Sequence, residues 1–168
     1  KGMGMMLRSL SDDDEVLELR IDDSQASAKT SRAIVASRLV EGVFPKWQEV
    51  IPAHCSQEIE LDRVEWIGAL RKAKLLTNQE SRSVRLKFEE GRLIIASRAL
   101  EVGEAHVEMD VTFEGPEVEV GFNPDYLIEA LNVVRSEKVR FAFNGPTSPG
   151  KVTDGDSFTY VVMPVSLE

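Results

Sequence analysis

Apolar positions in this chain recur at two spacings, one typical of helices and one typical of strands. Residues 1–10, 62–76 and 123–134 carry apolar side chains three or four residues apart, which predicts three helices with one buried face each. The predicted buried positions are Met3, Met6, Leu7, Leu10, Trp66, Ile67, Leu70, Ala73, Leu127, Ala130, Leu131 and Val134. Asn123 and Pro124 open the third helix, since asparagine is a favoured N-cap and proline fits the first helical turn.

Short runs rich in β-branched and aromatic residues predict the strands between these helices. The runs are residues 16–21, 26–30, 33–40, 57–61, 84–88, 92–97, 106–113, 117–122, 138–143 and 158–163. Glu89-Glu90-Gly91 predicts a tight hairpin turn, and Pro164 ends the last strand. Two prolines interrupt residues 41–52, which predicts a connector that is neither a helix nor a regular strand.

The predicted elements repeat in a fixed order. A strand, a helix and three strands cover residues 57–113, and a strand, a helix and at least two strands cover residues 117–163. A helix and three strands at residues 3–40 match the same unit without its first strand. Because units of this size need a neighbour to bury their apolar faces, we expect the second and third copies to form one domain. The first copy lacks its partner, so we expect the chain to begin within a domain.

Composition and charge narrow the range of functions that the chain can have. The net charge of −9 opposes a surface that binds nucleic acid over its whole extent, although a local basic strip remains compatible with it. Cys55 is the only cysteine, which excludes an internal disulfide and fits a reducing compartment. No apolar run approaches the roughly 20 residues that a membrane span needs. No secretory leader opens the chain, so we expect a cytoplasmic protein.

Candidates for catalysis or metal binding are weak. The acidic runs at residues 12–15 and 154–156 would have to converge to hold a cation, and each by itself is typical of a turn. His54 adjoins Cys55, but no second pair follows at zinc-site spacing, and His106 has no evident catalytic partner. We expect no catalytic residue, no metal and no cofactor. Two alternatives stay open: a small α+β metal-dependent hydrolase or nuclease built on the acidic runs, and an unassigned α+β interaction domain.

Two groups of residues at the end of the 62–76 helix are suggestive. Arg71, Lys72 and Lys74 would stabilise a helix C-terminus and would equally suit a phosphate backbone, and the pattern alone favours the first explanation. Leu75 and Leu76 lie outside the apolar stripe of this helix. At least one of them should therefore be poorly covered by the chain's own core, and a protein contact or packing beneath the next loop would explain it.

Four stretches of the chain carry a specific resemblance to one family. They are Ser37-Arg38-Leu39-Val40-Glu41-Gly42-Val43-Phe44-Pro45 with Val50-Ile51-Pro52, then Ser83-Val84-Arg85-Leu86, Gly121-Phe122-Asn123-Pro124-Asp125-Tyr126-Leu127 and Tyr160-Val161-Val162-Met163-Pro164-Val165. In this order and near this spacing they resemble the bacterial DNA polymerase III β subunit, the replicative sliding clamp. None of the four is a catalytic signature.

The resemblance implies an α+β DNA-clamp fold, with domains built from repeated β-α-β-β-β units, antiparallel sheets outside and helices on the inner face. Residues 1–52 would be the C-terminal half of the middle clamp domain with its connector, and residues 53–168 the complete C-terminal domain. The implied function is a non-catalytic processivity factor, a homodimeric ring around duplex DNA that tethers the replicative polymerase. Such a protein would be cytoplasmic and associated with the nucleoid.

The resemblance also implies site residues and partners. The polymerase III catalytic subunit, the clamp loader, other polymerases and repair proteins would bind an apolar groove through short linear peptides. The matching groove positions are Pro45, Val50, Asn123, Tyr126, Thr147, Pro149, Val161, Val162, Met163, Pro164 and Val165. Lys1, Lys72 and Arg82 would face DNA without sequence specificity, and Leu75, Leu76, Glu101 and Glu104 would lie at the subunit interface.

The chain departs from the family pattern at four positions near the groove. Glu49 stands where the best-known members carry a basic residue, Ser81 where some carry an aromatic one, and Ser166 where the tail often has arginine. Glu168 adds an acid, so the expected groove is less basic than in those members. The other wall of the groove would lie in the missing half of the middle domain. We therefore expect an incomplete groove, and a chain that does not close a ring by itself.

Overall fold

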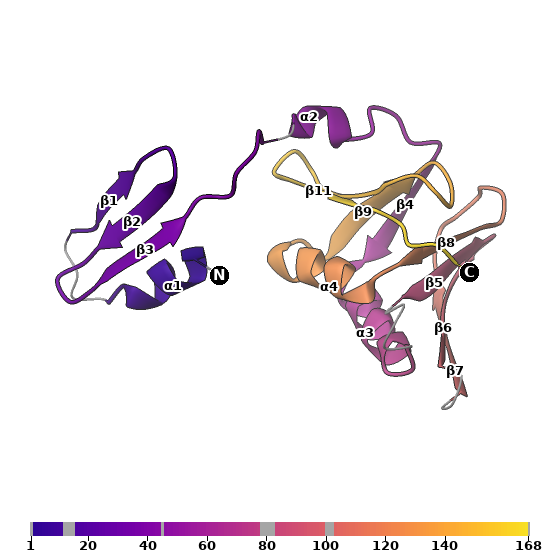
Figure 1. The fold of residues 1–168 in the computed structure, drawn as a ribbon. Helices are drawn as coiled ribbons and strands as arrows, with labels where there is room; N and C mark the ends of the chain where they lie inside the picture. The colour runs from indigo at the N-terminus through magenta and orange to yellow at the C-terminus, as the bar shows by residue number, and fades with distance from the viewer. Residues whose placement is uncertain (1, 12–15, 45, 78–82, 100–102, 168) are drawn as a thin grey trace. The chain divides into compact units, whose positions relative to one another are not determined.

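The computed structural model describes residues 2–11, 16–44, 46–77, 83–99 and 103–167. The chain divides into two compact units, residues 1–45 and residues 46–168 (Figure 1). We call them the first and the second unit and describe each by itself. Among the described helices, none combines the length and the apolarity that crossing a bilayer requires.

The first unit is one helix and one antiparallel sheet. Helix α1 (Gly2–Ser9) is followed by β1 (Glu18–Ile21), β2 (Gln25–Lys29) and β3 (Ile34–Arg38), which lie in the order β1-β2-β3. The helix lies against β3. The order of a helix and three strands predicted for residues 3–40 is therefore confirmed.

The apolar face predicted for the first helix is not buried, which corrects the expectation from its spacing. Met3 and Leu7 are 81% and 70% exposed, and α1 has no buried residue. Among the described residues of this unit, Ala28 and Thr30 are buried. The physical reason is that a single helix beside a three-stranded sheet has too few apolar neighbours to enclose its own side chains.

The second unit contains the two repeats in full. Its elements are α2 (Trp47–Val50), β4 (Gln57–Asp62), α3 (Arg63–Lys74), β5 (Val84–Glu89), β6 (Arg92–Ala99), β7 (Gly103–Asp110), β8 (Val118–Phe122), α4 (Pro124–Val133), β9 (Lys138–Phe143), β10 (Gly150–Asp154) and β11 (Phe158–Val162). Two elements were not predicted from the sequence. They are α2, which forms one helical turn within the connector, and strand β10. The Glu89–Gly91 hairpin is confirmed, with Gly91 at a φ of 74°.

The first strand of each repeat pairs with the sheet formed by the other repeat. The two antiparallel sheets have the orders β7-β6-β5-β8 and β11-β10-β9-β4. Strand β8, which opens the second repeat, pairs with β5 of the first, and β4 of the first repeat pairs with β9 of the second. The repeats are thus interlocked by this strand exchange and not merely packed against each other.

A single apolar core lies between the two sheets and the helices α3 and α4. The predicted buried stripes of both helices are confirmed, and Trp66, Leu70, Leu127 and Leu131 are fully buried. Phe141 of β9 lies at the centre of an aromatic cluster, with its ring centroid 5.3 Å from that of Trp66 and within 6.0 Å of three phenylalanine rings. This core fixes the start of α4 relative to the final strand β11.

Candidate functional site

The start of α4 is held by a cap that the sequence predicted. The side-chain oxygen of Asn123 accepts a hydrogen bond from the backbone N–H of Asp125, at 2.9 Å. This satisfies one of the amides that the first turn of a helix leaves without a partner. Pro124 is buried beneath the turn, whereas Tyr126 is 52% exposed. The capped turn therefore presents an aromatic side chain with a polar tip to solvent.

The C-terminal tail continues beyond β11 along the edge of β8. Within β11, Val162 pairs with Gly150 of β10 and is buried, while Val161 is half-buried. Met163 follows and is 60% exposed. Two residues later, the backbone N–H of Val165 donates to the carbonyl oxygen of Gly121 at 2.9 Å, forming an antiparallel bridge. The apolar chain past Pro164 is thus attached to the sheet by its backbone.

Helix α4 contacts β11, and the loop before β10 leads into the strand that pairs with β11. Burial raises the pKa of Tyr160 in β11, with smaller contributions from Glu129 and Tyr126 of α4. Pro149 precedes Gly150, which pairs with Val162, the last residue of β11. We call this region the tail surface and define it by the following residues. They are Asn123, Tyr126, Thr147, Pro149, Val161, Val162, Met163, Pro164 and Val165.

Two expected groove residues are not included in the tail surface. Val50 lies on α2 and is 50% exposed, and none of the pairings described above reaches it. Pro45 lies outside the described residues. Glu49, also on α2, forms an ion pair with Lys46 at 3.2 Å. Of the other departures near the groove, Ser166 is exposed, and Ser81 and Glu168 lie outside the described residues.

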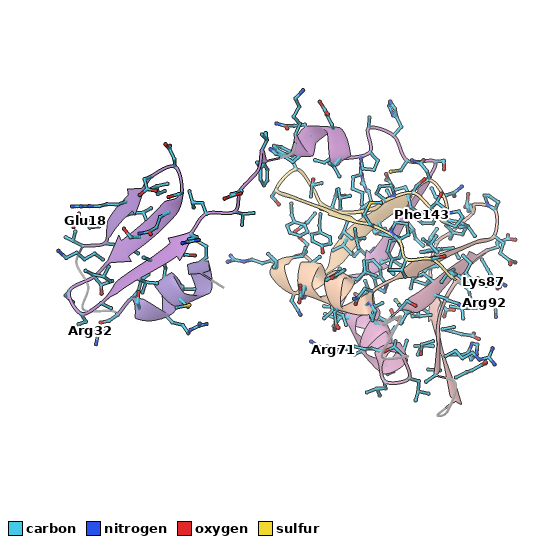
Figure 2. All side chains as sticks on the ribbon, viewed as in Figure 1. Glu18, Arg32, Arg71, Lys87, Arg92 and Phe143 are labelled. Carbon is cyan, nitrogen blue, oxygen red and sulfur yellow. The ribbon has the colours of Figure 1, made fainter. Side chains whose placement is uncertain are left out.

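The basic residues of the second unit differ between its strands and its helices. Six of the seven lysines and arginines on its strands form ion pairs within their own sheets. These pairs are Arg85–Glu119, Lys87–Glu89, Arg92–Glu108, Arg98–Glu104, Lys138–Glu60 and Arg140–Glu58. On α3, Lys74 pairs with Asp125 of α4, whereas Arg71 and Lys72 are exposed and have no ion pair to a described residue. Figure 2 labels Arg71 on α3 and Lys87 and Arg92 on the strands. Among the described residues of the second unit, Arg71 and Lys72 are thus two adjacent cations without an ion pair near the end of α3. Lys1 and Arg82 lie outside the described residues.

The residues expected at a subunit interface gather at the end of α3 and on β7. Leu75 is 81% exposed and Leu76 is half-buried, which confirms that the core leaves at least one of these leucines uncovered. Glu104 of β7 forms ion pairs with Arg98 at 3.3 Å and, when the imidazole is protonated, with His106 at 3.5 Å. Glu101 lies outside the described residues.

The acidic run near the end of the chain is a turn. The carboxylate of Asp154 accepts a hydrogen bond from the hydroxyl of Ser136 at 2.7 Å, and its backbone oxygen accepts from Ser157. Within the described ranges, no three histidine, cysteine or acidic side chains are grouped so as to hold a metal ion. Residues 12–15 lie outside the described residues. The hydrolase alternative has no support from the side chains that can be described.

Sequence reasoning did not identify Gly121 or Leu167 as a contact pair. A Cβ atom at Gly121 would lie 2.5 Å from Cδ2 of Leu167 and 2.8 Å from the carbonyl oxygen of Val165. A glycine within an otherwise apolar strand signals a close backbone approach. That signal was present at Gly121, but it does not reveal which segment makes the approach.

Comparison with known proteins identifies the family. A family model described as DNA polymerase III beta subunit, C-terminal domain, matches residues 48–166. The chain is 33% identical over 169 residues to the beta sliding clamp of Escherichia coli K12, and 32% identical over 169 residues to that of Vibrio cholerae. Each alignment covers 99% of this chain and 46% of the relative.

Solved structures agree with the sequence matches. The DNA polymerase sliding clamp of Pseudomonas aeruginosa superposes with a TM-score of 0.81 at 31% identity, covering 99% of this chain and 46% of that one. A second structure of that organism's sliding clamp, bound to griselimycin, superposes with a TM-score of 0.79. The fold predicted from sequence is therefore confirmed as the α+β clamp fold. The chain spans about half the length of the relatives it matches, and it belongs to the DNA polymerase III beta subunit family, the bacterial sliding clamps.

Proposed function

We propose that this chain acts as part of a sliding-clamp processivity factor, which tethers a DNA polymerase and other replication and repair proteins to duplex DNA. The observation that carries the proposal is the tail surface, where exposed Met163 lies between β11, which contacts α4, and Val165, which is bonded to Gly121 two residues before the Asn123 cap. The protein is a tether and not an enzyme. Residues 1–52 belong to a middle domain and residues 53–168 form the C-terminal domain.

The tail surface suits a short extended peptide. Met163 and the half-buried Pro164 and Val165 offer apolar area, and methionine adapts its shape to different partners. Tyr126 supplies an aromatic ring with a hydroxyl group at its tip. A few polar groups at the margin of an apolar surface are typical of sites that bind linear peptides. The partners are the polymerase, the clamp loader and repair proteins, through such peptides.

The distribution of charge favours α3 as the element that faces DNA. A ring that slides requires weak contacts to phosphates and no contacts to bases. Arg71 and Lys72 are free to make such contacts, whereas most cations on the strands are already neutralised. Exposed Leu75, with Leu76 and Glu104, would contact a second subunit and complete a homodimeric ring.

The peptide proposal can be tested by titration of the 168-residue chain. A fluorescein-labelled peptide with a glutamine followed by spaced leucine and phenylalanine residues is added, and its anisotropy is recorded. We expect measurable binding that Met163→Ala weakens by about tenfold or more, since buried apolar anchors dominate such interfaces. Val64→Ala is the control, because Val64 is 64% exposed on α3 and lies outside the tail surface.

Two results would contradict the proposal. One is that the unsubstituted chain leaves the anisotropy unchanged at millimolar protein concentration. The other is that Met163→Ala and Val64→Ala weaken binding equally, because the peptide would then be held by nonspecific apolar contact.

A further inference from the structure

The tail is attached to β8 at one glycine. The N–H of Val165 donates to the carbonyl oxygen of Gly121, and the side chain of Leu167 lies directly over the glycine Cα. A Cβ atom added at Gly121 would lie 2.5 Å from Leu167 Cδ2 and 2.8 Å from the Val165 oxygen. Both distances are well below van der Waals contact, so any residue other than glycine forces the tail away.

The backbone of Gly121 does not itself require glycine. Positive φ angles occur at Gly42, Gly91, Gly103 and Gly155, and Gly121 is not among them. A strand interior is an unfavourable place for glycine, because glycine loses the most entropy on folding and offers no side chain to pack. What glycine provides at this position is room for the tail to approach the strand.

The attachment lies between the two parts of the tail surface. Gly121 precedes the N-cap residue Asn123 by two positions, and Val165 follows Met163 by two positions. Holding Val165 against Gly121 therefore holds Met163 at a fixed place relative to the first turn of α4. A released tail would pivot at β11, which ends at Val162.

We propose that Gly121 and Leu167 form a latch that positions Met163 for peptide binding. The latch rests on the proposed function, because it acts on the same surface, and it assigns positioning roles to two residues that do not touch the peptide. Ordering the tail before binding removes an entropic cost that the complex would otherwise carry. Leu167 is half-buried and lies outside the apolar core, so its loss should change peptide affinity much more than thermal stability.

The test uses the full 168-residue chain with the substitutions Leu167→Ala and Gly121→Ala. Amide hydrogen exchange of Val165 reports the latch, the ¹³C-methyl resonance of Met163 reports its position, and anisotropy of the labelled peptide reports affinity. We expect Val165 exchange to become about tenfold faster, the Met163 resonance to shift and peptide affinity to fall on the order of tenfold. The Tm of Leu167→Ala should stay within about 4 °C of that of the unsubstituted chain.

Leu167→Met supplies the rescue, since methionine has a similar volume and should restore slow exchange and affinity. Leu167→Ala also covers the case in which Gly121→Ala fails to fold. Unchanged Val165 exchange, or faster exchange without a loss of affinity, would overturn the latch. If the unsubstituted chain binds no peptide, the proposed function fails by itself. The latch is then decided by exchange and by Met163, whose unshifted resonance in Leu167→Ala would refute it.

Discussion

The two units carry the same order of a helix followed by three strands, yet only one of them encloses its apolar residues. In the second unit, two copies exchange strands and bury Trp66, Phe88 and Phe141 completely. In the first unit, a single copy leaves α1 without any buried residue. Identical periodicity therefore produces a core in one unit and an exposed apolar stripe in the other. An amphipathic pattern specifies which face is to be covered, and the presence of a second copy decides whether it is covered.

The largest expected change in the difference between the two units follows from truncating the side chain at the centre of the second unit's core. Phe141→Ala should lower the free energy of unfolding by about 3–5 kcal/mol, through lost burial and the cavity left among neighbouring rings. Both tryptophans, Trp47 and Trp66, lie in the second unit, so denaturant unfolding followed by tryptophan fluorescence reports that unit alone.

The matched control is Leu7→Ala in α1, followed by circular dichroism. Since Leu7 is 70% exposed, this change should cost no more than about 0.5 kcal/mol. A cost similar to that of Phe141→Ala would show that the stripe of α1 is covered in solution.

Hydrogen exchange sharpens the comparison without any substitution. Amides in β4 and β9 should open only when the second unit unfolds, whereas those in β1 and β2 should open locally. We expect protection to differ by about 100-fold, which corresponds to about 2.8 kcal/mol. Mass spectrometry of peptic fragments from the 168-residue chain measures this. Equal protection in both sheets would contradict the difference between the units.

Acid titration gives the smallest expected effect. A hydrogen bond from Lys138, assisted by its charge, lowers the pKa of Glu60 below its ordinary value of 4.5 and joins the exchanged strand β4 to β9. The folded state therefore binds this proton less readily than the unfolded state. Its contribution to stability is complete above about pH 4.5 and is lost as pH falls through the folded pKa.

Glu60→Gln should accordingly make the fluorescence-detected Tm less dependent on pH between 5 and 3, by a small amount because the pair is exposed. Asp22→Asn is the control in the first unit, where backbone hydrogen bonds from Ser24 and Gln25 lower the pKa of Asp22. It should leave the fluorescence transition unchanged. An unaltered pH dependence in Glu60→Gln would show that the ion pair does not stabilise the exchanged strands.

Elements set by local pattern were predictable from the sequence, and contacts between distant segments were not. The stripe of α4 and its Asn123 cap follow from residues within one or two turns, and the structure confirms both. The strand exchange depends on pairing between β4 and β9, about which neither strand's own pattern carries information. The prolines of residues 41–52 predict a connector without a helix, yet α2 forms one helical turn there. Pro52 follows this turn and therefore does not interrupt it.

The candidate site was predictable only in part for the same reason. The resemblance supplied the residues of the tail and of the α4 start, and the structure brings most of them together. The contact of Leu167 with Gly121 joins residues 46 positions apart, and glycine reveals only that something approaches it. Whether α1 is covered depended on a second copy of the repeat, which the spacing of Met3 and Leu7 does not specify.

The strand exchange has a consequence for biosynthesis. Partners in β4 and β9 are 76 to 86 residues apart, so β4 leaves the ribosome long before the strand that completes its sheet. At roughly 5–20 residues per second, the edge of β4 stays unpaired for about 4–17 seconds during translation. Its outward-facing residues Glu58 and Glu60 and the terminal Asp62 are acidic, and charge on an open edge discourages pairing with other chains. Glu58 and Glu60 later form ion pairs with Arg140 and Lys138. Until β9 has been synthesised, the same two carboxylates discourage pairing of β4 with other chains.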